Sequence, residues 1–167
     1  MENLETGIPG LPDNEGEKLF YYFDIRQKHP QSKELYKNIG NNHDEFEKVV
    51  SESKNPLIGL EGKEILYKGN KIGTVHVTKD LFPQCVYKAD GHMDCGFFYQ
   101  IEIDLDAKDL DMQKAIDLVQ EAIGGQKIDY LEIQEQVPDK KPSPHSIGGY
   151  SIKSSRIVDP KTLKNNS

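Results

Sequence analysis

The eight residues from 97 to 104, FFYQIEID, constrain the fold more than any other stretch of the chain. Apolar and polar residues alternate along it: the apolar positions are Phe97, Tyr99, Ile101 and Ile103, and the polar positions are Gln100, Glu102 and Asp104. Successive side chains of a strand point to opposite faces, so this segment predicts a strand with one apolar and one polar face. Such strands are typical of antiparallel sheets that pack one face on the core.

Other segments also have the composition of strands. An aromatic and β-branched run predicts a buried strand over residues 18–26. The dipeptide Gly69-Asn70 suits a two-residue hairpin turn and predicts paired strands on either side of it. The predicted pair covers residues 64–67 and 72–77, and two later strands cover residues 128–134 and 150–157. The segment between residues 78 and 96 contains Pro83 and Gly91, and we expect a loop there.

Three helices are expected between these strands. Ser32 is a suitable N-cap for a first helix that ends at Gly40. Asn42, followed three residues later by Glu45, resembles a capping box and predicts a second helix that ends before residue 55. The third is predicted to start at Asp106 or Asp109 and to end before residue 124. Its apolar positions repeat at helical spacing: Met112, Ala115, Ile116, Val119, Ala122 and Ile123.

Together these elements predict an α+β fold, with one mainly antiparallel β-sheet packed against two or three helices. A chain of 167 residues is long enough for one domain with a substantial core. Glycine and proline punctuate the amino-terminal end, and the carboxyl-terminal end has little to bury. We therefore expect flexible tails over residues 1–17 and 159–167 and a single domain over residues 18–158.

The formal charge of −7 at pH 7 argues against a nucleic-acid-binding role, because neutralising phosphates requires clustered lysine and arginine. The apolar runs are too short for a membrane span, and we expect a cytoplasmic location. In that setting the two cysteines are predicted to be thiols or metal ligands rather than a disulfide. An acidic surface of this kind suits a basic protein partner.

Four residues form a candidate metal site: His76, Cys85, His92 and Cys95. Imidazole and thiolate groups are the ligands that tetrahedral zinc prefers. The pair His92 and Cys95, with two residues between them, is short enough to chelate from one turn. Against this hypothesis, His76 falls inside a predicted strand and Cys85 has no neighbouring ligand. The simpler interpretation is a loop with a buried thiol and exposed histidines.

A second enzymatic hypothesis treats the same region as half of a phosphodiester-cleaving site. His76 and Thr78 would face the same side of a strand, as in two-histidine phosphoesterases. That chemistry needs a second such strand, so that one histidine acts as base and the other as acid. The nearest candidate, at residues 144–147, places the hydroxyl one residue from His145 and lies in a proline-rich segment. The alternative function is thus a zinc-binding or phosphodiester-acting enzyme centred on His76 and the segment from Cys85 to Cys95.

The carboxylates allow two interpretations. Glu102 and Asp104 share a face of one strand, and Glu132 shares a face with Gln134 on another. Acids in such positions can bind Mg²⁺ as nucleases do, but the lysine that usually accompanies them is missing. They are better explained as the solvated face of the sheet. We therefore predict a small acidic interaction protein, similar in role to inhibitor or immunity proteins, that binds its partner through Glu102, Asp104 and Glu132.

Overall fold

The computed structural model describes residues 19–138 and 150–164. They form one six-stranded antiparallel sheet with the strand order β3-β4-β5-β2-β6-β7. The strands are β2 (Phe20–Lys28), β3 (Glu64–Tyr67), β4 (Asn70–Tyr87), β5 (Met93–Asp106), β6 (Tyr130–Pro138) and β7 (Tyr150–Val158). The helices are α1 (Ser32–Asn38), α2 (His43–Glu52) and α3 (Met112–Ile123), with short 3₁₀ turns η1 (Ile58–Leu60) and η2 (Pro160–Thr162). The predicted α+β fold is confirmed.

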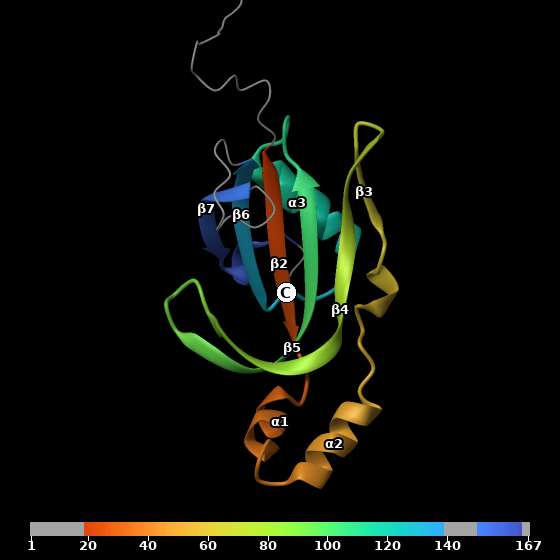
Figure 1. Ribbon diagram of the computed structural model, residues 1–167, viewed down its shortest axis with the longest axis vertical. Coiled ribbons are helices and arrows are strands. Elements are labelled where there is room, and N and C mark those ends of the chain that lie inside the picture. The colour runs from red at the N-terminus through yellow and green to blue at the C-terminus, as the bar shows by residue number, and fades with distance from the viewer. Residues whose placement is uncertain (1–18, 139–149, 165–167) are drawn as a thin grey trace, which may run out of the picture.

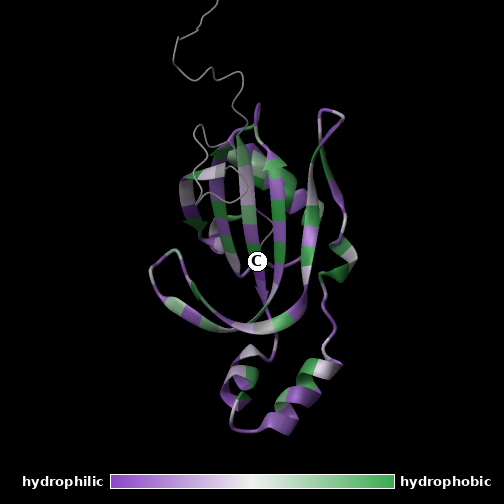
Figure 2. Ribbon diagram, in the orientation of Figure 1, coloured by the Kyte–Doolittle hydropathy of each residue, from purple (hydrophilic) through white to green (hydrophobic). Residues whose placement is uncertain are grey.

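One face of the sheet packs on α3 and forms the main core. Figure 1 shows α3 behind the sheet, and Figure 2 shows the alternation of hydrophilic and hydrophobic residues along the central strands. Phe23 of β2, Ile101 and Ile103 of β5 are fully buried on this face. The apolar stripe of α3 covers them. Asp111 caps the helix by accepting a hydrogen bond from the backbone N–H of Lys114 at 2.8 Å, and it lies two residues after Asp109, the later of the two predicted starts.

The hairpin between β3 and β4 turns one residue earlier than predicted. Lys68 and Gly69 both have positive φ, at 52° and 80°, which is the geometry of a tight hairpin turn. Glycine adopts this conformation without a steric cost. Lys68 has a Cβ atom and does incur a steric cost there, but the cost is limited to this one residue.

The prediction of a loop over residues 78–96 was wrong. β4 and β5 instead continue as a paired hairpin, and only residues 88–92 form its turn. We call residues 79–98 the arm; in Figure 1 it sweeps across the bottom of the sheet towards the side of β7. Pro83 fits in this strand because the only described partner there is β5, so its missing N–H lies at an open edge. An irregularity between Thr78 and Phe82 lets the arm bend away from the sheet.

The arm is held by a disulfide between Cys85 and Cys95, so the prediction of free thiols was also wrong. The two residues are direct partners in the register of β4 and β5. Residues directly opposite each other in an antiparallel pair bring their Cβ atoms about 4.5–5.5 Å apart, close enough for a bridge after small adjustments. Sequence spacing alone does not reveal this pairing, because it depends on where the hairpin turns.

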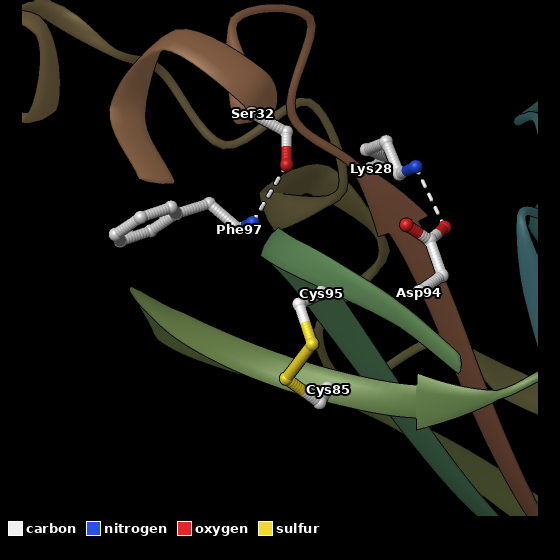
Figure 3. Close-up of a disulfide and its surroundings, with 6 residues drawn as sticks. All are labelled: Lys28, Ser32, Cys85, Asp94, Cys95 and Phe97. Carbon is white, nitrogen blue, oxygen red and sulfur yellow. Dashed lines mark hydrogen bonds and ion pairs between the residues drawn. A yellow bond between two sulfur atoms is a disulfide. The ribbon is translucent and has the colours of Figure 1, made fainter. Parts of the chain in front are cut away.

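The base of the arm is fastened to the sheet and to α1 (Figure 3). Lys28 at the end of β2 forms an ion pair with Asp94, at 2.6 Å. The hydroxyl of Ser32, at the start of α1, accepts a hydrogen bond from the buried backbone N–H of Phe97 at 2.7 Å. These contacts fix the direction in which the arm leaves the sheet.

The packed part of the chain continues past the predicted boundary at residue 158. Asp159 caps η2 by accepting a hydrogen bond from the backbone of Lys161 at 3.0 Å, and Leu163 joins the main core with 8% of its surface exposed. Residues 1–17 lie outside the described residues.

Each helix of the described ranges is either too short or too polar to cross a membrane.

Candidate functional site: the polar face of the sheet

The face of the sheet opposite α3 carries a row of acidic residues. Asp24 of β2 lies directly opposite Glu102 of β5 on one side and opposite Glu132 of β6 on the other. His76 of β4 extends the row beyond Glu102. Residues directly opposite each other point to the same face, so these side chains lie side by side across four strands. The structure therefore brings together two of the three predicted partner-binding acids, Glu102 and Glu132, with Asp24 between them.

The central carboxylate of this row is neutralised within the protein. Asp24 is only 6% exposed and pairs with both donors on one side of the Arg26 guanidinium, at 3.1 and 2.9 Å. The amide of Gln100 donates a third hydrogen bond to it at 3.0 Å. Burial works against the charged form of Arg26, but the hydrogen bond and charge of Asp24 outweigh it and raise the pKa of the guanidinium.

The two flanking glutamates accept hydrogen bonds from hydroxyl groups. Tyr22 donates to Glu102, and Tyr130 and Ser155 donate to Glu132 at 3.0 and 2.7 Å. Burial raises the pKa of both tyrosines, and the neighbouring glutamates raise it further. These hydroxyls consequently stay protonated at physiological pH and act as donors to the carboxylates.

Asp104, the third predicted acid, differs from the other two. It lies two residues beyond Glu102 on the same face and is exposed. Partial desolvation raises its pKa, and the negative charge of Glu102 raises it further, while His76 acts in the opposite direction. Within the described ranges no ion pair neutralises it. The centre of the face thus brings four carboxylates, Asp24, Glu102, Asp104 and Glu132, close to the guanidinium of Arg26.

The predicted zinc ligands lie on different parts of the molecule. His76 is on the polar face with its Nδ1 atom 3.6 Å from Glu61, while His92 is in the turn of the arm, 3.1 Å from Asp90. Cys85 and Cys95 are bonded to each other. Among residues 19–138 and 150–164 no group of three or more metal-ligating side chains converges. The zinc hypothesis therefore depends on a reduced form of the arm and stays a prediction.

His76 and Thr78 do share the polar face, as alternation along a strand predicts. Thr78 makes a hydrogen bond to Gln100 at 3.4 Å, in the row next to the acids. The second histidine considered for phosphodiester cleavage, at position 145, lies outside the described residues.

A large cleft lies elsewhere, between the end of β2 and α2, with a volume of about 920 Å³. It contains a histidine and a serine in contact: Nε2 of His29 is 2.7 Å from Oγ of Ser53. Nδ1 of His29 accepts a hydrogen bond from the backbone N–H of Gln31 at 2.9 Å, so the ring proton is on Nε2. The imidazole therefore donates to Ser53, whose own hydroxyl donates to the carbonyl of Val49 at 2.6 Å. A general base would accept the hydroxyl proton of the serine, whereas here the ring donates its own proton to the serine oxygen. The pair is therefore not arranged as a base and a serine nucleophile.

Comparison with known proteins adds no assignment to this site. No family model, curated protein or solved structure matches the chain.

Three residues of the face were missed by the sequence interpretation: Tyr22, Asp24 and Arg26. A signal for them exists, because they alternate with the buried Tyr21, Phe23 and Ile25. Treating residues 18–26 as a uniformly buried strand concealed this period of two. A strand in the centre of a one-sided antiparallel sheet has a polar face even when its composition is largely aromatic.

Proposed function

We propose that this chain is a non-enzymatic interaction protein that binds a basic protein partner through the polar face of its sheet. One observation carries the proposal: Asp104 is exposed beside Glu102, and its pKa is raised by desolvation and by that like charge. A cationic group of a partner, placed between the two carboxylates, would relieve the repulsion and favour the ionised form of Asp104.

The rigidity of the surrounding face supports the same proposal. The acids of the row are already oriented by the hydroxyls of Tyr22, Tyr130 and Ser155. Side chains that are held in place before binding lose less conformational entropy when a partner arrives. Inhibition of a partner with a basic surface, by covering that surface, is one concrete form of this function.

The test compares two variants with the same loss of charge. In Glu102→Gln/Asp104→Asn the change is on the polar face, and in the control Asp109→Asn/Glu121→Gln it is at exposed positions elsewhere. Wild type and both variants are used to capture partners from the native host at low and at high salt. We expect a partner that is retained by wild type and control at low salt, lost at high salt, and lost with the face variant. Equal capture by the face variant and the control, or capture that ignores ionic strength, contradicts the proposal.

A cytoplasmic location is also a proposal, and the disulfide bears on it. Disulfides persist in oxidising compartments and are rare in the reducing cytosol. Alkylation of thiols during extraction from native cells distinguishes the two cases. Two alkylated cysteines support the cytoplasm, whereas an intact bridge between Cys85 and Cys95 supports an oxidising compartment.

A further inference from the structure

A second cavity lies between the turn of the arm and the ends of β6 and β7. Its volume is about 340 Å³. Lys88 and Ala89 of the arm turn line it, and so does Lys161 of η2. Ile128, Tyr130 and Ile157 contribute apolar surface. None of these residues belongs to the acids proposed above to bind a partner.

The apolar side of the cavity is built by a small hydrophobic cluster separate from the main core. Val86, on the inner face of the arm, packs with Phe98 and Tyr130 and against Ile157. Tyr130 is 7% exposed, and its hydroxyl is already engaged with Glu132, so the ring presents an apolar edge to the cavity. The arm therefore closes over the end of the sheet and shapes a site that no single strand could form.

The carboxylates around the cavity already have partners within the chain. Asp90 accepts a hydrogen bond from the backbone N–H of His92 at 2.9 Å, and Asp129 accepts one from that of Lys28 at 2.8 Å. Asp159 is occupied as the cap of η2. Their remaining capacity to attract a ligand cation is correspondingly reduced.

The ammonium groups are less occupied. Asp94 is 2.6 Å from Lys28 but 3.8 Å from Lys88, so Lys28 is its closer partner. Among the described residues no ion pair involves Lys161. A third lysine of the lining, Lys127, is paired with Asp129 at 3.6 Å. Lys88 and Lys161 are therefore the lining lysines with the most spare hydrogen-bond donors.

We propose that this cavity binds a small carboxylic acid with a single ring or branched apolar body. The carboxylate would lie between Lys88 and Lys161, and the apolar body would lie against Ile128, Tyr130 and Ile157. The volume is near the lower end of the roughly 300–1,000 Å³ that ligand sites span, which fits a one-ring compound better than a nucleotide. Ligands of this kind are bound by apolar contact and oriented by one or two charged hydrogen bonds.

Three probes separate the contributions to binding: phenylacetate, its neutral amide phenylacetamide, and acetate. Each is titrated into the isotope-labelled full chain while backbone amide shifts are recorded by NMR. We expect phenylacetate to shift the amides of residues 88–90, 128–130 and 157–161. Since a hydrogen bond to a charged group contributes about 1.5–3 kcal/mol, phenylacetamide should bind at least roughly tenfold more weakly. Acetate, which lacks the ring, should produce no saturable shift in this region.

Variants of the two lysines test their role directly. Lys88→Gln and Lys161→Gln should each weaken phenylacetate binding several-fold, whereas Lys33→Gln, at an exposed position of α1, should leave it unchanged. Equal binding of phenylacetate and phenylacetamide, no saturable shift at millimolar concentration, or unchanged affinity in both lysine variants would overturn the proposal. Because Glu102 and Asp104 are not involved, any of these outcomes leaves the partner-binding proposal standing.

Discussion

Substitution of Gly96 by alanine tests how α1 is fastened to the base of the arm. A Cβ atom at this position would overlap with the hydroxyl oxygen of Ser32, while it would lie 3.5 Å from the Cβ of Ser32, an ordinary contact distance. Only the hydroxyl is therefore in the way. Rotating Ser32 removes the overlap but breaks its hydrogen bond with the backbone N–H of Phe97, which is 2.7 Å long.

The cost of Gly96→Ala follows from that single bond. Ser32 is 3% exposed and Phe97 is fully buried, so no water replaces the lost acceptor. A buried donor left without a partner costs about 1–3 kcal/mol, and the lower chain entropy of alanine in the unfolded state offsets roughly 0.5 kcal/mol of it. We expect a net loss of about 1.5 kcal/mol in the free energy of unfolding for Gly96→Ala and about 2 kcal/mol for Ser32→Ala, which removes the same bond.

A double-mutant cycle turns this into a sharp test. In the double variant the hydroxyl is absent, so the alanine at position 96 overlaps with nothing and no further bond is lost. The loss of the hydrogen bond and the entropy offset of alanine then give a cost of about 1.5 kcal/mol for the double variant, well below the sum of the two single losses. The measurement is urea unfolding, with the slope of free energy against urea unchanged among variants. Gly59→Ala, where an added Cβ meets no atom within 4 Å, is the control and should have almost no effect.

Additive losses in the cycle would show that Gly96 and Ser32 act independently and would refute the reasoning. A neutral Gly96→Ala would do the same, because it would mean that Ser32 does not occupy the space beside residue 96.

Three further predictions concern the charged groups and the disulfide. Arg26→Met should lower the free energy of unfolding by about 3 kcal/mol, because it leaves the buried Asp24 without its counterion. The double variant Arg26→Met/Asp24→Leu should recover much of that loss, as measured by chemical unfolding. If it recovers none, the broken ion pair is not the cause of the loss. Burial lowers the pKa of His29 in the folded protein below its usual 6.5. As the pH falls, His29 is therefore protonated in the unfolded chain before it is protonated in the folded protein. The free energy of unfolding should decrease as the pH falls from about 6.5 towards the lower pKa of the folded state. Unfolding measured from pH 8 to 5 should show this loss in wild type and less of it in His29→Asn; identical pH profiles would exclude His29 as the source. Cys85 and Cys95 are ten residues apart, and the chain-entropy relation gives about 3 kcal/mol for a loop of this size. Cys85→Ser/Cys95→Ser should therefore lower the free energy of unfolding by up to that amount. An unchanged thermal unfolding curve would mean that the packing of Val86, and not the disulfide, holds the arm.

The proposed function and the proposed ligand cavity use different residues, although Tyr130 lines the cavity and also donates a hydrogen bond to Glu132. The acids of the row lie on the sheet, whereas the cavity lies where the arm closes on the ends of β6 and β7. Both depend on the arm. Its turn lines the cavity, and its residue Gln84 accepts a hydrogen bond from Arg26, which also donates to Asp24 of the acidic row. A change that releases the arm would therefore alter the charged face and the cavity together.

The sequence by itself determined the two faces of β5, the packed face of α3 and the cap of α2. Alternation over residues 97–104 identified the apolar and polar sides of β5, and helical spacing over residues 112–123 identified the face of α3 that packs on the core. The cap formed by Asn42 on α2 was also predicted and is present. These features depend on residues within one or two turns of each other, and the chain carries that information directly.

Only the tertiary structure decided which strands are neighbours and where β4 ends. β2 lies between β5 and β6, and this order places Asp24 between Glu102 and Glu132, although they are far apart along the chain. The bend after Thr78 and the open edge beside Pro83 allow a strand to continue where local signals indicate a loop, and the resulting register pairs Cys85 with Cys95. Register is set by burial of whole strand faces against the core, and no short segment contains that information.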